Sequence, residues 1–174
     1  MKTFQDLQEG VYDPNILKAF FLAGGPGSGK SYVVKRGTGG LGLKIVNSDD
    51  VFEKYLKDAG LSLKMPKSEE EPRDKLRDRA KAVTKAKMGN YVEGRLGLII
   101  DGTGKDYDKI AKQATQLKQL GYDVHMIFVN TSLETALKRN AERERTVPRS
   151  VATKSWKTVQ NNMGKFSQYF RQNF

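Results

Sequence analysis

The chain has 174 residues, with 31 lysines and arginines against 20 aspartates and glutamates, and its formal net charge is +11. It contains no cysteine and one histidine, which excludes a disulfide scaffold, a thiolate zinc site, a cysteine nucleophile and a histidine-rich metal site. The excess of positive charge predicts an anionic partner without identifying it. At this length we expect one domain, spanning residues 1–174.

No apolar run approaches the roughly 18 residues that a membrane-spanning helix needs. The first six residues, Met-Lys-Thr-Phe-Gln-Asp, lack the apolar core of a signal peptide. We therefore expect a cytoplasmic protein with no membrane partner. The sequence leaves the oligomeric state open.

Short apolar runs alternate with amphipathic segments along the chain. Apolar runs bounded by turn residues indicate buried strands, and apolar residues at helical spacing indicate helices. In chain order, the patterns predict a strand at 18–23, a helix that begins near residue 30, a strand at 43–47, a helix at 50–58, a loop at 61–68, one or two helices over 70–93, a strand at 96–100, a helix at 106–120, a strand at 122–129, and helices at 132–144 and 149–170.

The alternation of strands and helices indicates right-handed βαβ units and therefore a mainly parallel sheet. We expect an α/β fold with three layers, in which helices cover both faces of a four- or five-stranded sheet and residues 60–95 form a helical insertion. The number of strands stays open, because the sequence stops at Phe174, where a fifth strand would follow the last helix.

Residues 24–31, Gly-Gly-Pro-Gly-Ser-Gly-Lys-Ser, match the P-loop pattern G-x-x-x-x-G-K-[ST] at every fixed position. They lie between a predicted strand and a predicted helix, which is the context that the pattern requires. Such a loop directs several backbone N–H groups at an anion, and the helix N-terminus adds positive potential. The motif predicts ATP and Mg²⁺ as ligands of a P-loop NTPase-type fold. The candidate ATP-binding residues are Gly25, Pro26, Gly27, Ser28, Gly29, Lys30 and Ser31, and Ser31 is also a candidate Mg²⁺ ligand.

Carboxylates follow two of the predicted strands at the edge that faces the phosphate loop. Asp49 and Asp50 come after the strand at 43–47. One of them could accept a proton from an attacking hydroxyl while the other caps the next helix, or both could be helix-capping acids. Asp101 ends the strand at 96–100 and is a candidate Mg²⁺ ligand, with a turn aspartate before Gly102 as the alternative.

Four arginines, Arg139, Arg143, Arg145 and Arg149, follow the fourth predicted strand. The first two are four residues apart and should share a helix face. Residues 138–149 could therefore form a lid that closes over ATP, neutralises charge on the transferred phosphoryl group and excludes water. The alternative is a solvated basic helix that pairs with its own glutamates.

The positive charge is concentrated in two segments. Residues 60–95 carry ten basic and six acidic side chains, and residues 136–174 carry nine basic and two acidic ones. Six cations of the first segment could line a channel for a phosphate acceptor, or they could form a solvated helix face, and both interpretations remain open. They are Lys75, Arg77, Arg79, Lys81, Lys85 and Lys87.

Three motifs occur together in this chain. They are the phosphate loop, the Asn-Ser-Asp-Asp sequence at 47–50, and the Arg-Asn-x-x-Arg sequence at 139–143 with Val-Pro after it at 147–148. This combination resembles the kinase domain of phage polynucleotide kinase and the wider group of zeta-toxin-like P-loop kinases, over roughly residues 18–150. The resemblance implies a phosphotransferase with an alcohol group as acceptor. It implies that Asp49 is the general base, that Lys30 and Ser31 bind ATP and Mg²⁺, and that Arg139 and Arg143 form the lid, Arg143 with a catalytic role.

The chain departs from polynucleotide kinases at Ser48, where those enzymes have an arginine, and we expect it to lack their phosphatase domain. These departures bear on the acceptor more than on the kinase chemistry. The resemblance implies a nucleic acid or nucleotide as the acceptor, either a 5′-hydroxyl or a hydroxymethyl pyrimidine in DNA. Some phage enzymes of this group modify such pyrimidines, and a phage-encoded protein would act in the host cytoplasm. The alternatives are a zeta-toxin-like kinase of a nucleotide sugar and a nucleic-acid-stimulated ATPase.

Overall fold

The computed structural model describes residues 13, 15–37, 39–64 and 66–174. The first six residues, from which we expect no signal peptide, lie outside these ranges. Within them, no helix combines the length and the apolar character needed to cross a lipid bilayer.

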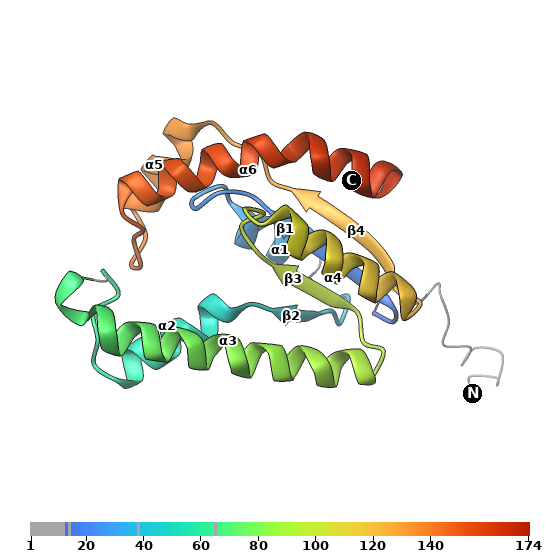
Figure 1. Cartoon of the computed structure of the whole chain (residues 1–174), viewed down its shortest axis with the longest axis horizontal. Helices are drawn as coiled ribbons and strands as arrows, with labels where there is room; N and C mark the ends of the chain where they lie inside the picture. The colour runs from blue at the N-terminus through green and yellow to red at the C-terminus, as the bar shows by residue number, and fades with distance from the viewer. Residues whose placement is uncertain (1–12, 14, 38, 65) are drawn as a thin grey trace.

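Four parallel strands form one sheet in the order β2-β3-β1-β4 (Figure 1). The interior strand β1 pairs with β3 and β4, and its side chains from Phe21 to Ala23 are fully buried. The predicted parallel sheet is thus confirmed, and the described residues add no fifth strand to it. The strands are β1 (Lys18–Ala23), β2 (Lys44–Val46), β3 (Leu98–Asp101) and β4 (Asp123–Phe128).

Six α-helices and two short 3₁₀ helices complete the described fold. The segment predicted as one or two helices over 70–93 is a single helix, and α2 begins two residues earlier than predicted because Asn47 caps it. The α-helices are α1 (Lys30–Gly37), α2 (Ser48–Asp58), α3 (Glu70–Glu93), α4 (Tyr107–Gln119), α5 (Leu133–Ala141) and α6 (Arg149–Phe170), and the 3₁₀ helices are η2 (Lys67–Glu69) and η3 (Arg171–Asn173).

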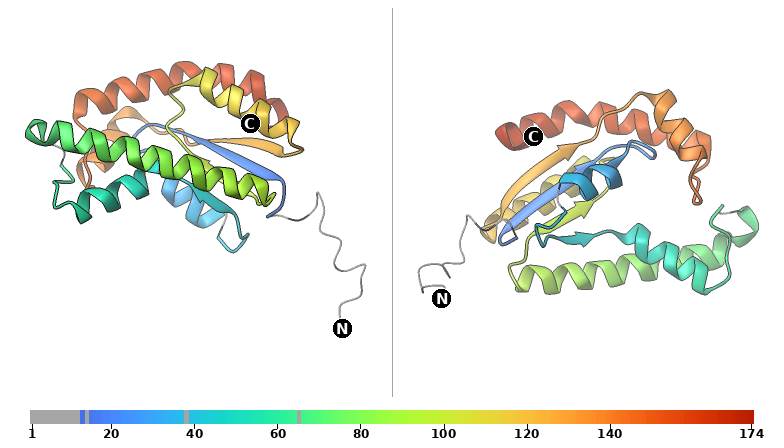
Figure 2. Two further views of the ribbon diagram at one scale, coloured as in Figure 1. Left: turned by 60° about the horizontal axis from the view of Figure 1, so that its bottom comes forward. Right: turned by 180° about the vertical axis from the view of Figure 1, so that it is seen from behind.

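Helices lie on both faces of the sheet, which confirms the predicted three layers (Figures 1 and 2). On one face α1 buries Val34 against Leu22 and Ile99. The other face is covered by α4, α6 and the C-terminal part of α3, which together form the largest apolar cluster. Helix α2 packs on the N-terminal half of α3 through Phe52 and its neighbours. This pair of helices extends beyond the edge of the sheet at which the strands end (Figure 1).

Helix α5 ends at Ala141, three residues before its predicted end. The cause is the buried Asn140, whose Nδ2 donates to the Val147 carbonyl (2.7 Å) and whose Oδ1 accepts from the Val147 N–H (3.2 Å). These two hydrogen bonds turn the chain back toward α6. Arg143 therefore lies beyond the helix, and the prediction that it shares a helix face with Arg139 is wrong.

Replacing Asn140 by alanine should lower the free energy of unfolding by about 1–3 kcal/mol, because the Val147 N–H and carbonyl lose their partners. Urea unfolding followed by circular dichroism measures the change. Asn161→Ala, on the exposed face of α6, is the matched control and should change stability by less than about 0.5 kcal/mol. Equal stabilities of the two variants would contradict the proposed role of Asn140.

Candidate functional site

The phosphate loop leaves β1 at Gly24 and enters α1 at Lys30, as the motif predicts. Gly27 has a φ of +79°, a conformation that favours glycine. A Cβ at Gly27 would overlap the carbonyl oxygen of Ala136, and one at Gly24 would lie 2.8 Å from the carbonyl oxygen of Val129. The close approach of β4 and α5 therefore leaves no room for a side chain at either position.

Lys30 folds back onto its own loop. Its Nζ donates to the carbonyls of Gly24 (2.7 Å) and Gly25 (3.4 Å). Burial lowers the pKa of Lys30, Asp101 opposes this shift, and Arg143 adds to it. The pKa of the P-loop lysine therefore depends on the nearby Asp101 and Arg143.

The other side chains of the motif differ in exposure. Ser28 is buried, and its Oγ has no hydrogen-bond partner in the described structure. Ser31 is exposed in the first turn of α1. Arg139 lies beside the loop, since its Nη1 is 3.4 Å from the position that a Cβ at Gly29 would take. A phosphate bound by the loop would therefore have a hydroxyl and a guanidinium close to it.

Helix α6 supports the loop through Trp156, a residue to which the sequence assigns no role at the site. The indole Nε1 donates to the carbonyl of Thr131 (2.9 Å). A Cβ at Gly25 would lie 3.4 Å from Cα and Cδ1 of Trp156. The tryptophan thereby joins α6, the segment after β4 and the phosphate loop.

Two arginines hold the carboxylate of Asp49. Arg77 Nη1 lies 2.6 Å from Oδ1, and Arg145 Nη2 lies 3.1 Å from Oδ2. Burial acts to raise the pKa of Asp49, but Arg145 and Arg77 outweigh it and hold that pKa below its ordinary value. Asp49 is therefore a carboxylate at neutral pH, and its side chain remains 41% exposed.

Asn47 connects the ends of β2 and β3. Its Oδ1 accepts from the N–H of Asp49, while its Nδ2 donates to Asp50 (3.0 Å) and Asp101 (3.1 Å). The helix cap is thus Asn47, which contradicts both interpretations on this point, since neither one nor both of the aspartates cap α2 and both lie in its first turn. An asparagine before a predicted helix is a recognisable capping signal, but no sequence signal links residue 47 to Asp101.

Asp50 and Asp101, the other two aspartates at this edge of the sheet, have raised pKa values. For Asp101 burial is the main cause, Lys30 opposes it, and Asp49 adds to it. For Asp50 burial again comes first, followed by repulsion from Asp49 and Glu53. A cation placed between these carboxylates would relieve their repulsion.

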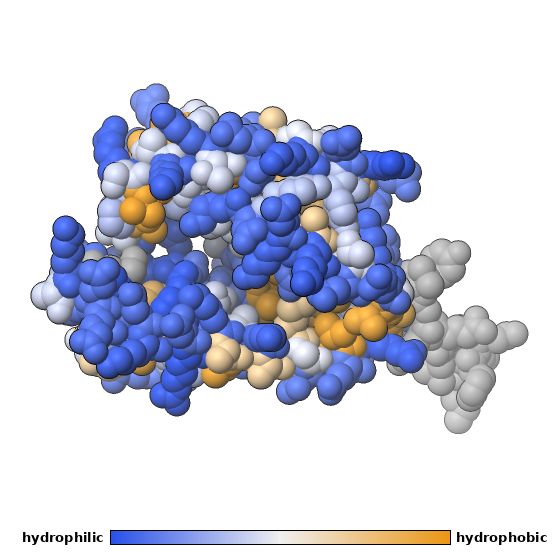
Figure 3. All heavy atoms as spheres, in the orientation of Figure 1, coloured by the Kyte–Doolittle hydropathy of each residue, from blue (hydrophilic) through white to orange (hydrophobic). Residues whose placement is uncertain are grey.

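Two adjoining hollows lie at the carboxyl edge of the sheet, and Ser31 and Arg139 are not among the residues that line them. Lys30, Asp49 and Arg143 line one of about 420 Å³, and Asp49 and Asp101 line another of about 320 Å³. Figure 3 shows a hollow between the part that contains α5 and α6 and the part that contains α2 and α3, with mainly hydrophilic residues around it. Arg77, Thr103 and Lys105 line both hollows with Asp49.

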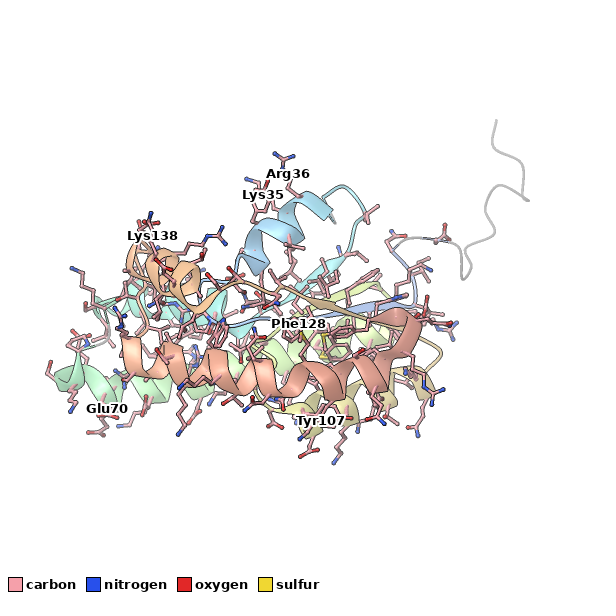
Figure 4. The ribbon with its side chains drawn as sticks, turned by 90° about the horizontal axis from the view of Figure 1, so that it is seen from above. Lys35, Arg36, Glu70, Tyr107, Phe128 and Lys138 are labelled. Atoms are coloured by element: carbon pink, nitrogen blue, oxygen red, sulfur yellow. The ribbon has the colours of Figure 1, made fainter. Side chains whose placement is uncertain are left out.

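Other basic side chains near the motifs point elsewhere. Lys35 and Arg36, at the end of α1, and Lys138, on α5, project away from the sheet (Figure 4). All three are exposed. The net charge of the chain therefore overstates the number of cations that face the site.

Comparisons with known proteins agree with this fold. A family model described as AAA domain matches residues 20–166. No curated protein sequence matches the chain. Among solved structures, a chain of the Pnkp1/Rnl/Hen1 RNA repair complex superposes with a TM-score of 0.67 at 22% identity, over 87% of this chain and 46% of that one.

Two further structures are similar. The AvrRxo1-ORF1:-ORF2 complex with ATP gives a TM-score of 0.70 at 16% identity, over 88% of this chain and 50% of the other. The PezAT toxin–antitoxin system of Streptococcus pneumoniae gives a TM-score of 0.66 at 19% identity, over 87% of this chain and 64% of the other. The chain thus spans about half to two-thirds of the length of these neighbours. The phosphate loop and the family match over most of the sequence show that this chain belongs to the AAA domain family and has a P-loop fold.

Proposed function

We propose that this protein transfers the γ-phosphate of ATP to a hydroxyl group of a nucleic acid or nucleotide. The observation that carries the proposal is the carboxylate of Asp49 in the same hollow as Lys30 of the phosphate loop and Arg143. A phosphate loop holds the donor, and a carboxylate beside it serves as a base for the acceptor. The ATP in the structure of a protein with the same fold supports the choice of donor.

In the proposed reaction Asp49 accepts the proton of the acceptor hydroxyl while the hydroxyl oxygen bonds to the γ-phosphorus. The bond between that phosphorus and the β,γ-bridging oxygen breaks, and ADP leaves with the electron pair. A carboxylate offers about four lone-pair sites, so the contacts with Arg77 and Arg145 leave sites for the acceptor. These arginines keep Asp49 ionised before the acceptor binds.

The lid and the phosphate loop would share the charge of ATP. On binding, Lys30 would exchange the loop carbonyls for the β- and γ-phosphates. Arg139, next to Gly29, and Arg143, in the hollow, would neutralise the transferred phosphoryl group as parts of a lid over 138–149. Because the Asn140 hydrogen bonds to Val147 shape this segment, it presents its arginines from a folded turn.

Mg²⁺ would bind together with the nucleotide. No cluster of three or more acidic, histidine or cysteine side chains suited to a metal occurs in the described ranges. In phosphoryl-transfer sites Mg²⁺ is usually held by one or two side chains plus substrate phosphates. Ser31 and Asp101 offer hard oxygen ligands of that kind, and bound Mg²⁺ would neutralise phosphate charge and orient the γ-phosphate.

The decisive experiment incubates the protein with γ-labelled ATP, Mg²⁺ and a panel of acceptors. The panel comprises 5′-hydroxyl oligonucleotides, hydroxymethyluracil DNA, mononucleotides and nucleotide sugars. Label should appear in a nucleic acid or nucleotide. Free phosphate without any labelled acceptor would indicate an ATPase, and label in nucleotide sugars alone would favour a zeta-toxin-like activity.

Asp49→Asn should lower turnover by about 10²-fold or more, because the amide cannot accept the hydroxyl proton. ATP affinity, measured by calorimetry, should stay close to that of the unchanged protein. Asp50→Asn is the matched control, because its carboxylate lies next in sequence and contacts Asn47 instead of the arginines. If Asp49→Asn keeps its activity, the base must be another group, with Asp50 and Asp101 as the next candidates.

Lys30→Ala should weaken ATP binding and turnover together, because the lysine contacts the phosphates in both the bound and the transition state. The two effects are separated by calorimetric binding of ATP and by steady-state kinetics. Lys35→Ala, at the outward end of α1, is the control and should change neither quantity. A Lys30→Ala protein with normal ATP affinity would rule out the proposed phosphate contact.

A further inference from the structure

A groove continues from the candidate site between α3 and α4. Its volume is about 440 Å³, and Ser48, Ile100, Asp101, Lys109 and Gln113 line both this groove and the smaller hollow beside Asp49. The two spaces therefore adjoin each other. The α3–α4 groove is lined by Val46, Ser48, Lys81, Thr84, Lys85, Met88, Ile100, Asp101, Lys109, Lys112, Gln113 and Gln116.

One row of cations runs along α3 from the site into the α3–α4 groove. Arg77, Lys81 and Lys85 follow at intervals of four residues, so they share a face and rise by about 6 Å from one to the next. Arg77 lines both hollows at the site, and the two lysines line the groove. The row thus extends from the partner of Asp49 toward the far end of the groove.

The other three of the six cations singled out from the sequence do not line the groove. Lys75 pairs with Glu71 (2.8 Å), Arg79 lies over the ring of Tyr55 (5.1 Å) and Lys87 is exposed. The fold therefore places half of that set at the site or the groove and the other half away from both.

The facing wall adds lysines from α4. Lys109 and Lys112 are three residues apart and line the groove. Lys81 pairs with Asp78 (2.9 Å), and in the described structure Lys85, Lys109 and Lys112 have no ion-pair partner. Among the described lining residues Asp101 is the one carboxylate. The groove thus carries positive charge from both walls that its own acids do not balance.

The groove is not lined by cations alone. Val46, Met88 and Ile100 are apolar, and the amide of Gln113 donates from α4 to Met88 Sδ on α3 (3.1 Å). Cations beside apolar side chains suit a chain that alternates charged phosphates with sugars and bases. The strand has to be unpaired where it enters the groove, because only then can its acceptor hydroxyl reach the hollow beside Asp49.

From this arrangement we propose that the α3–α4 groove binds the phosphodiester backbone of a single-stranded nucleic acid whose acceptor hydroxyl enters the hollow beside Asp49. Lys81 and Lys85 from one wall and Lys112 from the other contact its phosphates. The assignment of this strand as the acceptor rests on the proposed kinase function. DNA and RNA share the chemistry that the groove recognises.

The test is fluorescence anisotropy with short labelled single-stranded DNA and RNA, over a range of salt concentrations. Lys85→Glu/Lys112→Glu should weaken binding at least about tenfold at low salt. The slope of log affinity against log salt should become shallower by about 1.4, because two phosphate contacts are lost at about 0.7 each. Unchanged ATP affinity shows that the variant is folded.

Lys54→Glu/Lys87→Glu is the matched control, since it removes the same charge from exposed positions outside the groove. Its binding should stay within about twofold of the unchanged protein. Equal losses of affinity in the two double variants would overturn the proposal, and so would unchanged binding by Lys85→Glu/Lys112→Glu. A loss of affinity in Lys85→Glu/Lys112→Glu that the control does not show supports the proposal, whether the strand is DNA or RNA.

Because strand binding can be measured without turnover, the kinase function and the groove assignment can be refuted independently of each other. A protein that binds strands through the groove but labels no acceptor contradicts the kinase function and leaves the groove assignment intact. A protein that phosphorylates mononucleotides and binds no strand keeps the kinase function and refutes the groove assignment.

Discussion

The close approach of backbone to backbone around the phosphate loop is the constraint on which the site depends. Gly27 lies against the carbonyl of Ala136 and Gly24 against that of Val129, so a Cβ at either position would displace β4 or α5. Because β1 is an interior strand that pairs with β3 and β4, the loop emerges between the ends of these two strands. This position brings Lys30 near Asp101, at the end of β3, and brings Arg139 of α5 to the other side of the loop.

Electrostatic balance then decides how the acidic residues of the edge behave. Asp49, Asp50 and Asp101 lie close enough to repel one another, and burial adds to the cost of their charge. Only Asp49 is held below its ordinary pKa, because arginines from α3 and from the segment after α5 contact its two oxygens. One carboxylate thereby joins three parts of the chain and stays ionised, as a general base at neutral pH must.

The same helix that positions Arg77 also provides a wall of the α3–α4 groove. On α3 a four-residue interval keeps Arg77, Lys81 and Lys85 on one face, while its other cations lie over Tyr55 of α2, pair with acids of α3 itself, or face solvent. Since α4 packs on the same face of the sheet, its lysines lie opposite that row. The arginine partner of Asp49 and the groove are therefore parts of one arrangement, in which the direction of α3 sets both.

The strands and most of the helices, the phosphate loop, and the placement of Asp49 and Asp101 at one edge could be predicted from the amino-acid sequence. Hydrophobic periodicity and glycine spacing are local, and parallel strands bring their carboxyl ends together wherever they occur. Three further features come from the packing of the folded chain: Arg77 and Arg145 hold Asp49, Asn47 bonds to Asp101, and Asn140 ends α5 early. The contacts at Asp49 and Asp101 join residues 28 to 96 positions apart, and Asn140 bonds across a turn, so each depends on how the chain packs, which no local pattern encodes.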